Sequence, residues 1–295
     1  MVSVIVTTYN RSQLLQRLLS GLANQTFPNE KFEIIVVDDG STDDTATICK
    51  AMSTLLPNLV LLKMETNSGQ ARSAIRGIVI AKGDKYLFTD DDCIPDPTWI
   101  EKMNESLLKY PIVAGAIRTP LSDYRILVEN ISEFHPFLLG NRDRVVPFIA
   151  GANMGYRKEF FNKVSAFKPG YAIPDMELIL RARESGFSIQ FIGEAIVTHD
   201  PRRGNFQKII HHATHASYHT IQLRNTHATL LKTPFILKSS ALLLLFSPII
   251  ALAKTIQIFT GNRELLRVLH AAPAVFLLKL AWCWGAFRGL RSMDR

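Results

Sequence analysis

Four apolar runs alternate with amphipathic segments in the first hundred residues, and this alternation restricts the fold more than any other feature. Each run is short enough for one buried strand. Leucines recur after the first run at Leu14, Leu18 and Leu22, which is the spacing of one helix face. Strands that alternate with helices predict a parallel, doubly wound sheet. The four runs are residues 2–7, 33–37, 60–62 and 86–88.

Acidic residues follow two of these runs. Asp38-Asp39 ends the second run, and Asp90-Asp91-Asp92 ends the fourth. Doubly wound sheets bind ligands beyond the carboxyl ends of their strands, so we expect both clusters in one crevice. Three adjacent carboxylates repel one another, and a hard divalent cation removes that penalty. The triplet therefore predicts a metal–diphosphate site. The alternative is a polar turn before the next helix, which Asp96-Pro97 already caps.

The second half of the chain holds further strand and helix signals. Residues 111–117 predict one strand, and residues 189–192 and 195–198 predict two short ones, the last ending at His199. Pro174 begins a helix whose first turn carries acidic residues, as the helix dipole favours.

Composition narrows the class of partner. The chain has 295 residues, enough for one large domain or two small ones, and a net charge of +8 that favours a polyanionic substrate or surface. No nucleic-acid-binding motif is present, so we expect phosphorylated substrates or anionic lipids and no nucleic acid. Cys49, Cys93 and Cys283 show no CxxC spacing, which predicts a reducing compartment. The N-terminus does not have the pattern of a signal peptide.

The character of the chain changes after about residue 202. Two apolar segments, residues 239–253 and 268–287, are each marginal for a membrane span of about 20 residues. Trp282 and Trp284 are typical of membrane-contacting helices. We expect membrane association and leave spanning and interfacial binding as alternatives, with a buried hairpin as the third. A basic, His-rich stretch precedes the segments and contains Arg202, Arg203, Lys208, His211, His212, His215 and His219.

In their order and spacing, these motifs resemble those of family 2 glycosyltransferases with the GT-A fold, over residues 2–200. The resemblance implies a doubly wound mixed sheet of GT-A type, nucleotide-binding and Rossmann-like, followed by a hydrophobic helical region. It implies a catalytic domain at 1–205, a basic connector at 206–234 and membrane-associated helices at 235–295. The matching segments are 4–10, 37–41, 67–69 with Gly77 and Gly83, the DxD motif at 90–92, 151–153 with Arg157, and 175–178 with Arg181.

The resemblance also implies an activity. We expect a metal-dependent, inverting glycosyltransferase that uses Mn²⁺ or Mg²⁺ to move one sugar from a nucleotide-diphosphate sugar, UDP-linked rather than GDP-linked, to a hydroxyl acceptor. The expected acceptor is a lipid-linked or membrane-proximal glycan, at the cytoplasmic face of the cell membrane. Processive synthases carry a Gln-x-x-Arg-Trp motif, which this chain lacks, so single-sugar addition is expected.

Residue roles follow from the same resemblance. Asp175 is the expected general base, and Asp92 the expected direct metal ligand, with Asp90 and His199 beside it. Tyr9 is expected to stack on the nucleobase and Asp39 to accept a hydrogen bond from it. The remaining expected contacts are Thr7, Arg72, Asp90 and Asp91 for the nucleotide-sugar, and Gly151, Asn153 and Glu177 on the acceptor side.

Each role has a structural alternative. The alternatives are a core aromatic for Tyr9 and a turn residue for Asp39. For His199 the alternative is a solvated strand end, and for Asp175 it is an acid that only stabilises its own helix. Two departures from the family's pattern matter, because Pro174 stands where a Glu is usual and Ala74-Ile75 stands where Arg-Asn is usual. The competing functions are a nucleotidyltransferase of similar fold and a non-catalytic nucleotide-sugar-binding membrane module.

Overall fold

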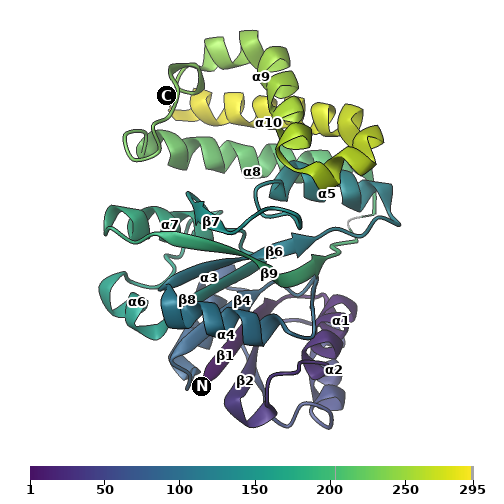
Figure 1. Cartoon of the computed structure of the whole chain (residues 1–295). Coiled ribbons are helices and arrows are strands. Elements are labelled where there is room, and N and C mark those ends of the chain that lie inside the picture. The colour runs from purple at the N-terminus through teal and green to yellow at the C-terminus, as the bar shows by residue number, and fades with distance from the viewer. Residues whose placement is uncertain (203, 294–295) are drawn as a thin grey trace. The chain divides into compact units, whose positions relative to one another are not determined.

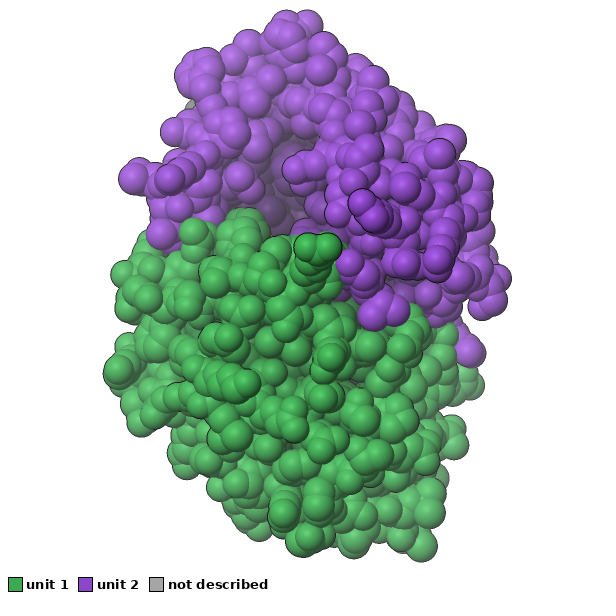
Figure 2. Space-filling view, in the orientation of Figure 1, with its two compact units in different colours: residues 1–118, 141–201 green, residues 119–140, 202–295 purple. Residues whose placement is uncertain are grey.

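The computed structural model describes residues 1–202 and 204–293, and the chain divides into two compact units. Unit 1 comprises residues 1–118 and 141–201, and unit 2 comprises residues 119–140 and 202–295 (Figure 2). The expected boundary near residue 205 lies close to the second junction, but the segment 119–140 belongs to unit 2 instead of the catalytic part. Arg203, named in the basic stretch, lies outside the described residues.

A nine-stranded mixed sheet forms the centre of unit 1 (Figure 1). Its order is β3-β2-β1-β4-β8-β6-β9-β5, and β7 pairs with β9. The four predicted strands are β1 to β4, and they are mutually parallel, whereas β8 runs antiparallel to both β4 and β6. The strands are β1 (Val2–Thr8), β2 (Phe32–Asp38), β3 (Leu59–Lys63), β4 (Lys85–Thr89), β5 (Cys93–Pro95), β6 (Ile112–Arg118), β7 (Arg144–Val146), β8 (Asn153–Arg157) and β9 (Ile189–His199).

Helices lie between the strands of unit 1, as the alternation predicted. In α1 the side chains of Leu15, Leu18 and Leu22 are fully buried, which confirms that the leucine stripe faces the core. The helices are α1 (Ser12–Ala23), α2 (Thr45–Met52), α3 (Gln70–Ile80), α4 (Trp99–Lys109), α6 (Lys158–Lys163) and α7 (Pro174–Glu184), with a 3₁₀ turn η1 (Asn29–Lys31).

The two short strands expected at 189–192 and 195–198 are one strand, β9. Its pairing with β6 shifts between Gly115 and Ala116, so that Ile192 and Ile196 face consecutive residues of β6. The intervening residues bulge out of the ladder, and the amide of Gly193 donates to Asp143 at 2.7 Å. This bulge interrupts the alternation of apolar residues along β9. The sequence pattern therefore predicted two strands where the structure has one.

Unit 2 is helical, and both apolar segments form long helices within it. Two of its helices are long and apolar enough to cross a membrane, by length and composition. Side chains from three helices meet in one apolar cluster that includes Ile221, Leu243 and Ala286. The helices are α5 (Tyr124–Phe134), α8 (Phe206–Thr226), α9 (Ser240–Gly261) and α10 (Ala272–Met293), with 3₁₀ segments η2 (Phe235–Leu237) and η3 (Arg263–Ala271).

The three cysteines predict a simple test of this packing. Cys49, Cys93 and Cys283 are all buried free thiols, and burial raises the pKa of Cys49 and of Cys283 to about 11. Because the thiolate is the reactive form, we expect no thiol of the folded chain to react quickly with Ellman's reagent at pH 8. All three should react in denaturant. Fast reaction of one thiol in the folded protein would show that its packing is wrong.

Candidate active site

The strand ends bring the predicted residues together at one edge of the sheet. Thr8 and Asp38 are register partners at the ends of β1 and β2, and β4 ends directly before the acidic triplet. The antiparallel pairing of β5 with β9 places Cys93 opposite His199, and the amide of Asp200 donates to the carbonyl of Asp92 at 2.9 Å. The predicted convergence of the triplet and His199 is therefore present in the fold.

One guanidinium holds two of the three carboxylates. Arg11 lies 2.7 Å from Asp91 Oδ1 and 2.6 Å from Asp92 Oδ2, and the hydroxyl of Thr8 donates to Asp91 Oδ2 at 2.8 Å. The Nε2 atom of His199 lies 3.5 Å from Asp92 Oδ1. Sequence reasoning missed Arg11. Its only signal was its place directly after the turn at the end of β1, because its partners lie some eighty residues away.

The carboxylates remain crowded in spite of Arg11. Burial raises the pKa of Asp90 well above its ordinary value, and the charges of Asp92, Asp91 and Asp175 add to that rise. Burial likewise raises the pKa of Asp91 to about 6, although the charge of Arg11 opposes it. Carboxylate oxygens with one imidazole nitrogen are a donor set that suits Mn²⁺ or Mg²⁺. The residues present therefore fit the divalent cation that the resemblance implies.

Asp175 reaches the same cluster from α7. Burial raises the pKa of Asp90 and of Tyr156, and the negative charge of Asp175 adds to both rises. A Cβ on Gly151 would lie 3.0 Å from Asp175 Oδ2. The absence of a side chain at Gly151 therefore lets the carboxylate approach this backbone, and both predicted residues lie side by side.

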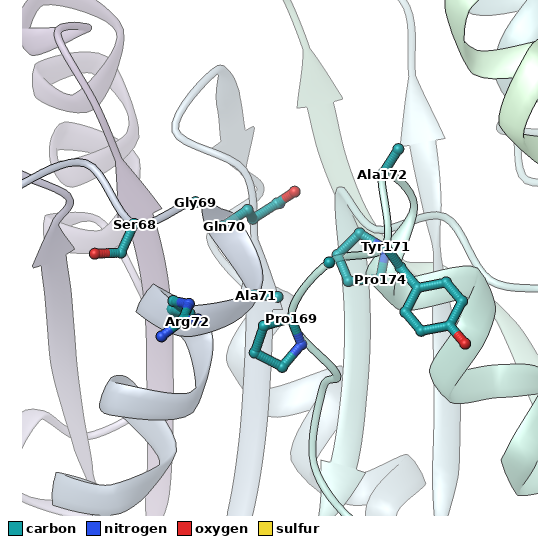
Figure 3. Close-up of a pocket in the computed structure, with 10 residues that line it drawn as sticks. Ser68, Gly69, Gln70, Ala71, Arg72, Pro169, Tyr171, Ala172 and Pro174 are labelled. Carbon is teal, nitrogen blue, oxygen red and sulfur yellow. The ribbon is translucent and has the colours of Figure 1, made fainter.

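A pocket of about 330 Å³ opens beside the triplet. The first turn of α3 forms one side of it, and the loop before α7 forms the other (Figure 3). The amide of Gln70 lies 3.4 Å from Asp90 Oδ1 and connects the pocket to the triplet. Arg72 lines the pocket, as does the N-terminus of α3, where the helix dipole favours anions. The predicted donor contact Arg72 thus lies where a phosphate group can be bound.

Three residues predicted to contact the nucleotide-sugar lie at the ends of β1 and β2. Tyr9 follows β1 and is 43% exposed, so its ring is not the core aromatic of the structural alternative. Thr7 is half-buried in β1. Asp39 accepts hydrogen bonds from the amides of Ser68 and Gly69, both at 2.8 Å. Asp39 therefore fixes the turn that begins α3, a role that the sequence did not predict.

The acceptor-side role expected for Asn153 does not fit its place in the structure. Its side chain is fully buried. Its Oδ1 accepts from Trp99 Nε1 at 2.9 Å, and its Nδ2 donates to the carbonyls of Ala116 and Ala195, both at 2.9 Å. Asn153 thus ties β6, β8, β9 and α4 together. The reason is its position on the inward face of β8, which the local pattern of small residues did not reveal.

Glu177 is also placed differently from the expectation. Both of its carboxylate oxygens accept from Arg181, at 2.7 and 2.8 Å, and Lys168 lies 3.5 Å away. Arg181 in turn donates to the carbonyls of Ser165 and Ala166. This ion pair, in which Glu177 is buried, holds α7 to the preceding loop. Glu177 therefore has a structural role. The spacing of four residues between Glu177 and Arg181 was a signal for that pair.

The comparisons with known proteins agree on one family. A sequence profile described as glycosyl transferase family 2 matches residues 3–165. Glycosyltransferase AglE of Haloferax volcanii is 27% identical over 205 residues, which cover 68% of this chain and 67% of AglE. The poly(ribitol-phosphate) beta-N-acetylglucosaminyltransferase TarS of Staphylococcus aureus is 44% identical over 92 residues, which are 30% of this chain and only 16% of TarS.

Two solved structures share the fold. The mannosyltransferase PcManGT from Pyrobaculum calidifontis, in complex with GDP-Man and Mn²⁺, has a TM-score of 0.70 and covers 99% of this chain and 87% of its own. TarS 1–349 of S. aureus in complex with UDP-GlcNAc has a TM-score of 0.59 and covers 100% of this chain and 92% of its own. Both are 18% identical in sequence, so the likeness shows the GT-A fold alone.

Asn153 gives the first prediction for this site. Asn153→Asp keeps the shape but loses both donated hydrogen bonds, and each unpaired buried polar group costs about 1–3 kcal/mol. We expect the free energy of unfolding to fall by about 2–4 kcal/mol in urea titrations. Asn162→Asp, at an exposed position of α6, is the matched control and should change little. Unchanged stability of the Asn153 variant would return this residue to the acceptor side.

Proposed function

This chain belongs to glycosyl transferase family 2 and is a glycosyltransferase, and we propose that it moves a single sugar from a nucleotide-diphosphate sugar to a hydroxyl group, with a divalent metal and with inversion at the anomeric carbon. The observation that carries the proposal is the convergence of the acidic triplet, Asp175 and His199 beside a pocket lined by Arg72. A nucleotidyltransferase or a non-catalytic binding module has no need of a carboxylate at the position of Asp175.

The metal in this proposal is Mn²⁺ or Mg²⁺, and Asp92 would hold it, with Asp90 and His199 beside it. When bound, such an ion stabilises negative charge on the departing diphosphate. The resemblance assigns Asp91 to the nucleotide-sugar instead, and its oxygens contact Thr8 and Arg11. Arg11 brings a positive side chain into contact with both Asp91 and Asp92.

The donor binds, in this proposal, along the carboxyl edge of β1, β2 and β4. Tyr9 presents an exposed ring for stacking on the base, with Thr7 beneath it. Asp39 holds the turn that starts α3, and this helix directs its N-terminal amides and Arg72 towards the diphosphate. A donor of the nucleotide-diphosphate-sugar class is supported by the family. The preference for UDP over GDP remains a proposal, since the fold neighbours were solved with either nucleotide.

Asp175 acts as the general base in the proposed reaction. It takes the proton from the acceptor hydroxyl while that oxygen attacks the anomeric carbon, and the bond from this carbon to the diphosphate oxygen breaks. One displacement inverts the configuration. Gly151 leaves room for the carboxylate and forms the adjacent wall of the acceptor side. Glu177 is held in its ion pair with Arg181, and Glu184 ends α7, so we assign this step to Asp175 in the first turn of the helix.

The acceptor in this proposal is a lipid-linked or membrane-proximal glycan. The support is the pair of long apolar helices in unit 2, which are suited to membrane association. Nucleotide-sugars are cytosolic metabolites, so the proposed location is the cytoplasmic face of the membrane.

Asp175→Asn tests the base. The variant keeps the side-chain shape and removes the proton acceptor, and general-base catalysis contributes typically about 10²–10⁴-fold. We expect kcat to fall within that range while the dissociation constant for the nucleotide-sugar changes less than about threefold. The measurement is release of the nucleoside diphosphate by the full chain, with donor binding followed by calorimetry. A loss below tenfold would remove the role from Asp175 and favour the binding-module alternative.

Removal of the metal gives an independent prediction. EDTA should abolish sugar transfer, and Mn²⁺ or Mg²⁺ should restore it. In addition, Mn²⁺ should raise the melting temperature of the wild-type chain, because neutralising buried carboxylates stabilises the folded state. Asp92→Ala should lose that rise, while Glu105→Gln, at an exposed acid of α4, should keep it. Full transfer by Asp92→Ala in the presence of EDTA would exclude the metal assignment.

A further inference from the structure

The positive charge of the chain is concentrated in unit 2. This unit contains 14 of the 34 Lys and Arg residues but only 5 of the 26 Asp and Glu residues, which gives it a net charge of +9. The remainder of the chain, unit 1, has a net charge of −1. The excess charge therefore does not serve the nucleotide site. It marks unit 2 as the part that meets an anionic surface.

An apolar stripe runs along the exposed side of α9. Leu245 is 70% exposed and Ile249 is 64% exposed. Leu252 and Ile256 continue the stripe at 53% and 55%, so the spacing i, i+4, i+7, i+11 keeps all four on one face. The opposite face, with Leu243 among others, is buried against the unit. Large apolar side chains exposed in a row indicate a surface that is covered by an apolar partner.

The second long helix, α10, lies alongside α8 and runs in the same direction (Figure 1). A Cβ on Gly285 would meet Thr214 and one on Gly289 would meet Tyr218, both on α8. Farther along, Gln222 of α8 donates to the hydroxyl of Ser292 at 2.8 Å. The glycines allow the two backbones to come close, so residues 285–292 of α10 lie along α8 itself.

This contact excludes a membrane-spanning arrangement of α10. A crossing α10 would draw α8 into the hydrocarbon, yet α8 carries Lys208, Arg224 and four histidines, which are expensive there. The contacts with α8 named above fall in residues 285–292 of α10, and residues 272–284 precede them. At 1.5 Å per residue they extend about 20 Å, whereas the hydrocarbon core is about 30 Å thick. Because α10 does not cross, α9 cannot cross either, since η3 would then lie on the wrong side of the membrane.

We infer that α9 and α10 lie in the plane of one leaflet and bind an anionic lipid bilayer without spanning it. The stripe of α9 enters the acyl region, and basic side chains beyond its end, such as Arg263 and Arg267, contact the head groups. This inference rests on the membrane association in the proposed function. The length and apolarity of the two helices fit a spanning and an in-plane arrangement equally well, and this inference selects the in-plane one.

The side of the membrane on which Arg267 lies distinguishes the in-plane arrangement from the spanning one. Arg267 lies in η3 between α9 and α10, with its side chain 79% exposed. Two spanning helices would put η3 on the opposite side of the membrane from unit 1, and two in-plane helices would keep it on the same side. The test uses Arg267→Cys, with Leu108→Cys of unit 1 as the control, because Leu108 is 65% exposed on α4. The native thiols are buried and give little background.

Membranes from cells that express the full chain are labelled with an impermeant maleimide, as intact spheroplasts and as inverted vesicles. We expect Arg267→Cys and Leu108→Cys to label from the same side. Labelling of Arg267→Cys from the opposite side to Leu108→Cys would overturn the in-plane arrangement and leave the membrane association intact. A chain that fails to sediment with membranes would instead overturn the membrane association itself.

Binding to vesicles tests the stripe. The full chain should bind phosphatidylcholine vesicles that contain 30% phosphatidylglycerol at least tenfold more tightly than pure phosphatidylcholine vesicles. The double variant Leu245→Glu, Ile249→Glu should lose at least tenfold in affinity for the mixed vesicles, without loss of fold because both side chains are exposed. Leu108→Glu is the control and should bind as the wild type does. Equal affinity of the double variant and wild type would refute the stripe as the docking surface.

Discussion

The repulsion among the carboxylates at the end of β4 is the constraint around which this site is built. Asp91 and Asp92 are nearly inaccessible to water, and their pairing depends on the single guanidinium of Arg11 and on the hydroxyl of Thr8. Both partners come from the end of β1, which is the parallel neighbour of β4. The parallel pairing of β1 with β4 therefore brings Thr8 and Arg11 to the triplet.

Polar contacts in the core hold the elements that carry the proposed catalytic carboxylates. Asn153 binds three elements around β8, and the pair of Glu177 with Arg181 fixes the helix that carries Asp175. Neither residue lines the pocket, yet each holds in place an element next to the proposed site. A site that is held by buried hydrogen bonds on strands and helices can be positioned more accurately than one on loops.

The sequence predicted the parts of this fold that depend on neighbours along the chain. Apolar runs, the leucine stripe of α1 and the acids at strand ends are local patterns, and all appear where expected. The antiparallel β8 between β4 and β6 and the transfer of residues 119–140 to unit 2 depend on distant contacts, so no local signal marked them. Arg11 illustrates the same limit in the site, because its partners lie at residues 91 and 92.

The division of charge between the two units is consistent with the two anionic partners that we propose, a nucleotide-sugar and a lipid surface. In this proposal a diphosphate that approaches the triplet would meet carboxylates, so its binding would depend on the proposed divalent cation. Anionic head groups meet the opposite situation in unit 2, whose basic side chains attract them without a metal. Unit 1, with its net charge of −1, gains little from the same lipid surface. In this proposal, unit 1 binds the soluble donor and unit 2 attaches the chain to the membrane.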